Sequence, residues 1–425
     1  MDRISQLPDE LLLRILSLMP LQDVADTMLL SKRWQFLWLM VPALTFDYFD
    51  YKLFDEELSN KEFSLYVERY LFLHEAPAID ALRFKLCESW ASGDIQVWLK
   101  AAEKRSLREL VIKICASTRT ESPVVELPRS LSRCFKTLVT LELRNTVLVD
   151  DVASPVFFPS LKKLSLESMK YPGDAFVAKL LSSCPDLEDL VVELCPSDNV
   201  SIFSVSLLNL KSLVLETSGD ISEGEAHGFV IDAPSLEYLK IDDNWDGFCV
   251  LENNINKIVK ASISTVRPYT EQLICYLSSA KRLDLCFEVS KNLCHVGSVF
   301  HHLKHLQICT CETEWLSLLM HMLNNSPNLR YLKLHMRCIK SELRPSWSEA
   351  SSVPECLLNS LETLEWDDYE GKKEDKEVVA FILKNGFCLE KVIIKPIPTS
   401  RKKRKMLKEL TFFTRSSPTC RIVYD

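Results

Sequence analysis

Cysteine and histidine side chains crowd one stretch of the sequence, and both kinds of side chain bind zinc. In chain order they are Cys294, His295, His301, His302, His305, Cys309 and Cys311. A structural zinc site needs four ligands, usually in closely spaced pairs, and this spacing fits none of those patterns. Leu303, Leu306 and Ile308 also interrupt the set at positions typical of a buried strand. We therefore predict no metal and no cofactor.

Motifs of the common enzyme classes are missing from the sequence. There is no Walker loop for a nucleotide, no HExxH helix for catalytic zinc, no GxSxG nucleophile turn and no GxGxxG dinucleotide loop. The sequence therefore predicts a protein that is not an enzyme.

A basic run, Arg401–Lys405, is typical of a nuclear import signal or of a nucleic-acid patch. A solvated turn has the same composition. The chain of 425 residues carries a formal net charge of −8, whereas a general nucleic-acid binder usually presents a basic face. We expect no nucleic-acid partner, and both import and a simple turn remain open.

The compartment is indicated by the start of the chain and by its cysteines. Residues 1–6 lack the basic and apolar segments of a secretion signal, and no run of about 18 apolar residues suggests a membrane span. The 15 cysteines are scattered and form no CxxC pair, as is typical of reduced thiols. These features predict a protein of the cytoplasm, the nucleus or both, without a membrane partner.

A repeated apolar frame must position all of these side chains. The frame is leucine, two variable residues, leucine, one variable residue and a last apolar residue, as in Leu161, Leu164 and Leu166. From Leu138 to Leu329 it recurs at steps of 22 to 26 residues, within the period of about 20–29 that is typical of leucine-rich repeats. The copies begin at Leu107, Leu138, Leu161, Leu187, Leu210, Leu236, Ile258, Ala280, Leu303, Leu329, Leu361 and Leu389, with Ile79 as an earlier candidate.

The frame predicts an α/β fold, a leucine-rich-repeat solenoid with a parallel β-sheet on its concave face. The last two apolar positions of each copy alternate as in a strand, and one unit cannot bury its apolar face without neighbours. Helices are expected at residues 62–71, 95–102, 174–182, 314–323 and 376–384. Cys87, Cys115, Cys195, Cys311 and Asn244 all lie three residues after the last apolar position, where this repeat class favours a buried turn.

Residues 1–46 differ from the repeats and predict three short helices. Leu11, Leu12, Ile15 and Leu16 place apolar side chains all round the first helix, and the third carries tryptophans. About 45 residues are near the lower size limit of an independent core. The excess of apolar surface indicates a partner. The alternative is that these helices cap the open end of the solenoid.

Three short motifs in this segment resemble the F-box: the Leu7–Glu10 opening, the turn Ile15–Ser17 and the element Ser31–Trp34. F-boxes dock onto the SKP-type adaptor of cullin–RING ubiquitin ligases, so the resemblance implies this partner. It also implies adaptor contacts from Leu7, Pro8, Ile15, Leu16, Val24 and Trp34. Some of these residues must also hold the helices together, and the sequence does not separate the two roles.

The end of the chain carries a second resemblance, to the plant FBD domain. It rests on Trp347, Val353–Leu357, Ser360–Trp366, Gly371, Val378–Asn385, Leu389–Val392 and Ser416–Cys420. Together the motifs resemble the plant F-box/FBD/leucine-rich-repeat family. The expected organisation is an F-box at 1–46, a linker helix at 47–78, repeats at 79–344 and an FBD domain continuing the solenoid at 345–425.

An acidic ladder is expected on the concave face, just after the last core residue of four successive repeats. It consists of Glu167, Glu193, Glu216 and Asp242. Like charges on strands about 4.8 Å apart repel one another. A basic segment of a target protein would relieve this repulsion, whereas a merely solvated acidic edge is the alternative.

These observations predict a substrate-recognition subunit of an SCF-type ubiquitin ligase, in which the F-box binds the adaptor and the repeats bind an unknown target protein. A leucine-rich-repeat scaffold that binds the adaptor without ubiquitination is the alternative.

Overall fold

A computed structural model describes most of the chain as two compact units, residues Met1–Leu210 and Lys211–Asp425. The described residues are 4–54, 59–87, 90, 92–103, 105–115, 125–127, 136–148, 157–196, 198–219, 227–245, 247–252, 255–265, 270–287, 298–311, 314–336, 352–397 and 409–424. Trp347, Cys294, His295 and the basic run at 401–405 lie outside them.

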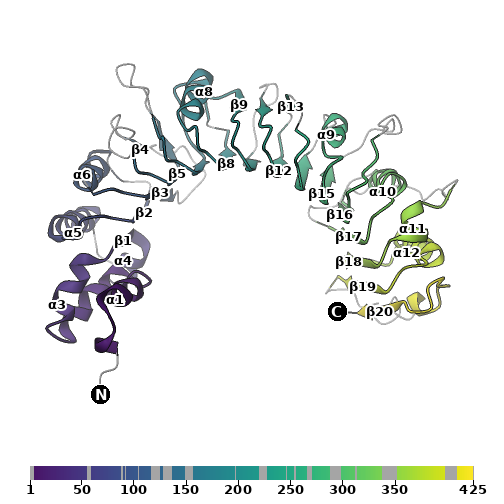
Figure 1. The fold of residues 1–425 in the computed structure, drawn as a ribbon, viewed down its shortest axis with the longest axis horizontal. Coiled ribbons are helices and arrows are strands. Elements are labelled where there is room, and N and C mark those ends of the chain that lie inside the picture. Colours follow the sequence, from purple (N-terminus) through teal and green to yellow (C-terminus); the bar gives the residue numbers. More distant parts are fainter. Residues whose placement is uncertain are drawn as a thin grey trace. The chain divides into compact units, whose positions relative to one another are not determined.

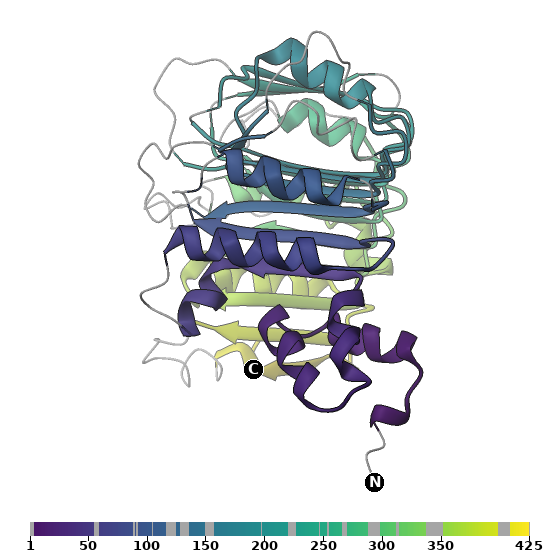
Figure 2. The ribbon, with the colours of Figure 1, turned by 90° about the vertical axis from the view of Figure 1, so that its left-hand side faces the viewer.

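The first unit begins with short helices and continues as a parallel sheet with helices on one face (Figures 1 and 2). Its helices are η1 (Ile4–Gln6), α1 (Asp9–Leu16), α2 (Leu21–Asp26), η2 (Thr27–Leu29), α3 (Trp34–Leu37), η3 (Trp38–Met40), α4 (Tyr48–Phe54), α5 (Asn60–Leu73), α6 (Ser92–Ala102) and α8 (Asp174–Ser182). Its main strands, in sheet order, are β1 (Ala43–Asp47), β2 (Ala81–Cys87), β3 (Glu109–Cys115), β5 (Thr140–Arg144), β7 (Lys163–Glu167) and β8 (Asp189–Leu194). Outside this sheet lie β4 (Val125–Glu126), β6 (Thr146–Val147) and β9 (Ile202–Ser206).

The second unit has the same arrangement of strands on one side and helices on the other (Figure 1). Its main strands, in sheet order, are β10 (Ser212–Thr217), β12 (Tyr238–Asp243), β14 (Lys260–Thr265), β15 (Arg282–Phe287), β16 (His305–Cys309), β17 (Tyr331–His335), β18 (Thr363–Tyr369), β19 (Lys391–Pro396) and β20 (Arg421–Tyr424). Its helices are α9 (Thr270–Tyr276), α10 (Trp315–Asn324), α11 (Glu355–Asn359) and α12 (Lys373–Asn385), and its outer strands are β11 (Gly228–Asp232) and β13 (Phe248–Leu251).

The apolar frames form the core of both units and confirm the predicted repeat. In every copy, from Ile79 to Ile394, the three frame residues are at most 2% exposed. The strands pair in parallel with equivalent frame positions opposite each other, as in Leu164 with Leu190 and Leu306 with Leu332. Burial of apolar surface on these rows is the main driving force for stacking one repeat on the next.

The predicted helices are present, and other repeats carry short strands in their outer segments. Helix α8 has the predicted bounds, and it begins after Gly173, whose φ of 146° favours glycine. In the second unit β11 and β13 pair in parallel and form a second layer outside the main sheet.

The expectation of buried turns is wrong for Cys115 and Asn244, which are exposed, and is confirmed for Cys311, which is buried. Cys87 and Cys195 are only half-buried. Strands β2 and β3 extend to Cys87 and Cys115 and pair these two residues in register. Because side chains alternate along a strand, the buried Ile114 is followed by an outward Cys115.

Candidate functional site

Helices α1 to α3 form a small core of their own. Its buried members are Leu12, Leu16, Val24, Trp34, Leu37 and Val41, with Leu7, Leu13, Met19 and Trp38 packed partly against it. The indole Nε1 of Trp34 donates a hydrogen bond to the Ser5 hydroxyl at 2.7 Å. The third helix is therefore fixed to the start of the chain by both apolar and polar contacts.

Arg33 links the Ser31–Trp34 element to the Leu7–Glu10 opening. Its guanidinium donates to the Asp9 carboxylate at 3.0 Å from Nε and to the Leu7 carbonyl at 2.5 Å. The ion pair is exposed, and such pairs stabilise a protein by about 0–1 kcal/mol. Its contribution is therefore mainly orientation, because it places the two resembling motifs against each other.

The predicted adaptor-contact residues separate into two groups in the structure. Leu16, Val24 and Trp34 are at most 4% exposed and hold the helices together. Pro8 is exposed, Ile15 is 42% exposed, and Leu7 is half-buried. Only the second group is therefore accessible at the surface, and adaptor contact by these residues stays a prediction.

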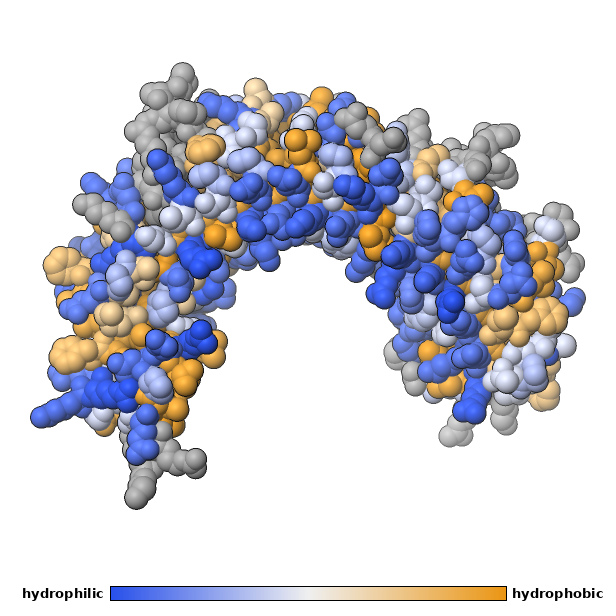
Figure 3. All heavy atoms as spheres, in the orientation of Figure 1, coloured by the Kyte–Doolittle hydropathy of each residue, from blue (hydrophilic) through white to orange (hydrophobic). Residues whose placement is uncertain are grey.

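Other large apolar side chains are exposed on these same short helices. They are Ile4, Leu11, Leu18, Met28, Leu29, Leu30 and Phe36, with Leu18 at 87% and Leu29 at 78% exposure. Figure 3 shows apolar atoms in this part of the first unit. The sequence did not assign these residues to adaptor contact, although Leu11, Ile15 and Leu18 recur at i, i+4 and i+7, the spacing of one helix face. We call the exposed apolar residues of this segment, Pro8 and Ile15 included, the F-box surface.

The segment after the third helix becomes the first strand of the repeat sheet. Strand β1 pairs in parallel with β2, from Ala43 opposite Ala81 to Asp47 opposite Lys85. The sheet therefore starts one strand before the first frame at Ile79. Helix α2 contacts this end strand, and the same segment carries the exposed apolar side chains described above.

His74, at the end of α5, joins the F-box helices to the repeats. Its Nε2 donates to the Val41 carbonyl at 2.9 Å, and its Nδ1 accepts from Arg105 at 2.7 Å. Burial lowers the pKa of His74, and the Arg105 charge lowers it further, so the ring is neutral. The hydroxyl of Tyr70 adds a hydrogen bond to the Trp38 carbonyl at 3.0 Å. These contacts hold the F-box helices in one orientation on the first repeats.

The open face is the side of each unit's sheet that is turned away from its helices, and polar residues cover it (Figure 3). The predicted acidic ladder lies here. Glu167 is opposite Glu193 in the first unit, and Glu216 is opposite Asp242 in the second. In each pair one carboxylate has a basic neighbour: Glu167 lies 3.6 Å from Arg144, and Glu216 accepts from Lys240. The ladder is thus partly neutralised by the chain itself.

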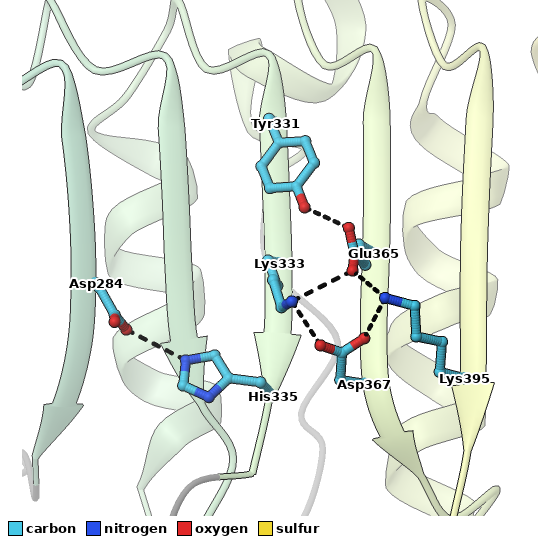
Figure 4. A network of polar contacts seen from close by, with 7 residues as sticks. All are labelled: Asp284, Tyr331, Lys333, His335, Glu365, Asp367 and Lys395. Carbon is cyan, nitrogen blue, oxygen red and sulfur yellow. Dashed lines mark hydrogen bonds and ion pairs between the residues drawn. The ribbon is translucent and has the colours of Figure 1, made fainter. Parts of the chain in front are cut away.

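A denser polar network covers β17 to β19 on the open face (Figure 4). The Glu365 carboxylate accepts hydrogen bonds from Tyr331, from Lys333 at 3.2 Å and from Lys395 at 2.6 Å. Asp367 pairs with the same two lysines at 2.5 and 3.1 Å. Burial disfavours the charged form of Glu365, but the donated hydrogen bonds outweigh it and lower its pKa to about 2. Two acids and two bases thus satisfy one another, which indicates a structural network.

Three cysteines are the group that comes nearest to a metal site among the described residues. Cys286, Cys309 and Cys311 are buried, and their sulfur atoms all lie within 4.8 Å of one another. The set differs from the predicted cluster, because Cys286 joins it and His301 and His302 are exposed. Hydrogen bonding with Cys309 and Cys311, together with burial, raises the pKa of the Cys286 thiol. Three ligands are one fewer than structural zinc requires, and the absence of a metal stays a prediction.

Family models match three parts of the chain. An F-box domain matches residues 4–44, the LRR repeats of FBD-associated F-box proteins match 95–263, and an FBD domain matches 349–394. Within the described residues no helix is long and apolar enough to cross a membrane. The fold and these matches define a leucine-rich-repeat protein that carries an F-box.

Proteins of Arabidopsis thaliana are similar over nearly the full chain. A probable FBD-associated F-box protein is 54% identical over 429 residues, covering 100% of both chains. A putative FBD-associated F-box protein is 50% identical, over 93% of this chain and 97% of the relative. An F-box/FBD/LRR-repeat protein is 42% identical, over 100% of this chain and 99% of the relative. The chain belongs to the family of FBD-associated F-box proteins. The family supports a substrate-adaptor role in general, with an F-box that binds an SKP-type adaptor, and such proteins are typically non-catalytic.

The Glu365 network predicts a loss of stability in acid. A carboxylate whose pKa is depressed in the folded chain stabilises it above the ordinary pKa of 4.5, and this contribution is lost as the pH falls from 4.5 to about 2. Glu365→Gln should therefore lower the urea midpoint at pH 6, and its difference from the parent chain should vanish toward pH 2. Glu377→Gln, on the exposed 3.9 Å pair with Lys373, is the control and should shift little. An E365Q difference that does not depend on pH would contradict the assignment.

Proposed function

We propose that this protein is the substrate-recognition subunit of an SCF-type cullin–RING ubiquitin ligase and is not itself an enzyme. The observation that carries the proposal is the F-box surface, because apolar side chains such as Leu18 and Leu29 remain exposed on helices that already have a complete core. An adaptor that covers this surface would remove its apolar area from water, at about 25 cal/mol per Å².

The attachment of the F-box helices to β2 supports the second half of the proposal. A ligase subunit of this kind acts by proximity, because it holds a target near a ubiquitin-charged enzyme supplied by other subunits. Proximity requires that the adaptor-binding part and the target-binding part do not swivel independently. The β1–β2 pairing and the His74 contacts provide this stiffness between the F-box and the first repeats.

The target would bind the open face of the repeats, where the acidic ladder is one candidate contact. Glu193 and Asp242 make no ion pair with any residue that the structure describes, whereas Glu167 and Glu216 have basic neighbours. A basic target segment would find the first two carboxylates available and would compete with Arg144 and Lys240 for the others.

Charge on the F-box surface should abolish adaptor capture. Ile15→Lys combined with Leu18→Lys places two ammonium groups where an adaptor must exclude water, and both side chains are exposed, so the fold should be unaffected. We expect affinity for a purified SKP-type adaptor, measured by biolayer interferometry on the full chain, to fall by about 100-fold or more.

A matched variant controls for the loss of exposed apolar area. Phe72→Lys combined with Val97→Lys changes two side chains that are 85% and 52% exposed on α5 and α6, outside the F-box. It should bind the adaptor as the parent chain does. Equal capture by I15K/L18K and the parent chain would refute adaptor binding through this surface. Adaptor capture without target ubiquitination in a reconstituted ligase would favour a scaffold.

Reversal of the acidic ladder tests its place in target binding. Glu193→Lys combined with Glu216→Lys should weaken binding of a fluorescent octalysine peptide by about tenfold at low salt, because attraction becomes repulsion. Glu355→Lys with Glu390→Lys, at exposed positions outside the ladder, is the control. If octalysine binding and the set of captured plant proteins both stay unchanged in E193K/E216K, the ladder is not a target contact.

A further inference from the structure

Basic side chains line the start of strands β14, β15 and β16 in the second unit, where Lys260, Arg282 and His305 lie on the open face. Lys260 is opposite Arg282, and Arg282 is opposite His305, in the parallel register. Lys281 and Lys304 directly precede Arg282 and His305. The four lysine and arginine side chains are exposed and His305 is half-buried. We call these five residues the basic row.

Tyrosines border the basic row on both sides. Tyr238 on β12 is opposite Lys260, whose ammonium lies 5.2 Å from the centre of the tyrosine ring. Tyr331 on β17 is opposite His305, with their rings 5.6 Å apart. The row therefore has defined ends on five adjacent strands.

The basic row lacks the acidic partners that neutralise other cations of the open face. Lys240 pairs with Glu216, and Lys333 and Lys395 share Glu365 and Asp367. Among the acidic side chains that the structure describes, none makes an ion pair with Lys260, Lys281, Arg282 or Lys304. Asp284, two residues beyond Arg282 on the same strand, is directed to His335 at 3.2 Å (Figure 4).

Like charges on strands about 4.8 Å apart repel one another, so this arrangement costs stability in the free chain. The effect reaches His305. Burial lowers the pKa of His305, and the neighbouring charges of Arg282 and Lys304 lower it further. An anionic partner would remove this repulsion, and the net charge of −8 makes a concentrated basic region an exception in this chain.

We propose that the basic row binds an acidic segment, rich in Asp and Glu, of the target protein. This inference rests on the proposed function and names the chemistry of part of the target. The four strand-to-strand steps from Tyr238 to Tyr331 span about 19 Å at about 4.8 Å each. An extended peptide covers this distance with about six residues. A short acidic segment lying across the strands therefore matches both the charge and the length of the row.

Binding of fluorescein-labelled octaglutamate to the full chain, followed by fluorescence anisotropy, tests the proposal. Octaglutamate should bind at about 50 mM salt, and its affinity should fall by about tenfold or more at about 300 mM. At both salt concentrations its affinity should be higher than that of uncharged octaglutamine. Lys281→Glu combined with Arg282→Glu should reduce its affinity by at least about tenfold at low salt. Thermal stability should not decrease, because the two substitutions relieve repulsion within the row. Adaptor capture should stay as in the parent chain, because both residues lie outside the F-box.

Lys162 and Lys163 provide the matched control. They occupy the same repeat positions as Lys281 and Arg282 but pair with Glu188 at 2.7 Å and Asp189 at 3.9 Å. Lys162→Glu with Lys163→Glu makes the same change in charge and should leave octaglutamate affinity unchanged.

Several results would overturn the proposal. They are no binding of octaglutamate by the parent chain, unchanged binding by K281E/R282E, or an equal loss in K162E/K163E. Tighter binding of inositol hexakisphosphate or a short DNA duplex, with the same dependence on Lys281 and Arg282, would also overturn it, because the occupant would then be a phosphate polyanion. Adaptor capture is measured on the same variants, so failure of the basic row is distinguishable from failure of the ligase role.

Discussion

The in-register stacking of apolar side chains along parallel strands is the constraint on which this structure depends. Leucine lies over leucine from repeat to repeat, as in Leu213 opposite Leu239 and Leu332 opposite Leu364. A slip of one residue would turn the core side chains of a strand toward solvent, so burial specifies the register strongly. The same register places the open-face residues in rows. The functional surfaces of the repeats are therefore a consequence of core packing.

The register also determines how the F-box is presented. Because β1 pairs with β2, the chain leaving the third helix enters the sheet directly, and hydrogen bonds such as Glu75 N–H to the Leu39 carbonyl at 2.9 Å reinforce the junction. The buried leucines of α1 serve this module's own core, and the exposed ones remain for a partner. Under the proposed function, an apolar surface fixed to the repeat sheet would serve a ligase subunit, since its part in catalysis is to restrict where the target can be.

Local patterns predicted most of the fold, whereas long-range pairings were beyond them. The leucine frame and α8 could be predicted because periodicity and a following proline are local signals. Strand β1 was not predicted, because Ala43–Asp47 lacks the leucine frame. Cys115 was wrongly predicted to be buried in a turn, because the length of its strand depends on pairing with the neighbouring strand. The sequence could not divide the F-box leucines into buried and exposed faces. Nor could it show that Lys240 neutralises Glu216, 24 residues away, while Lys260 and Arg282 lack such a partner among the residues that the structure describes.

The central claim is that the F-box offers an adaptor surface while fixed to the repeat sheet, and hydrogen–deuterium exchange tests it most directly. In the free chain, those amides of Ala43–Asp47 that face β2 should exchange slowly, because they belong to the sheet. Addition of an SKP-type adaptor should slow exchange in α1 to α3 and leave the strands from β10 to β20 unchanged. Rapid exchange in Ala43–Asp47, or adaptor protection confined to the repeat strands, would contradict the account.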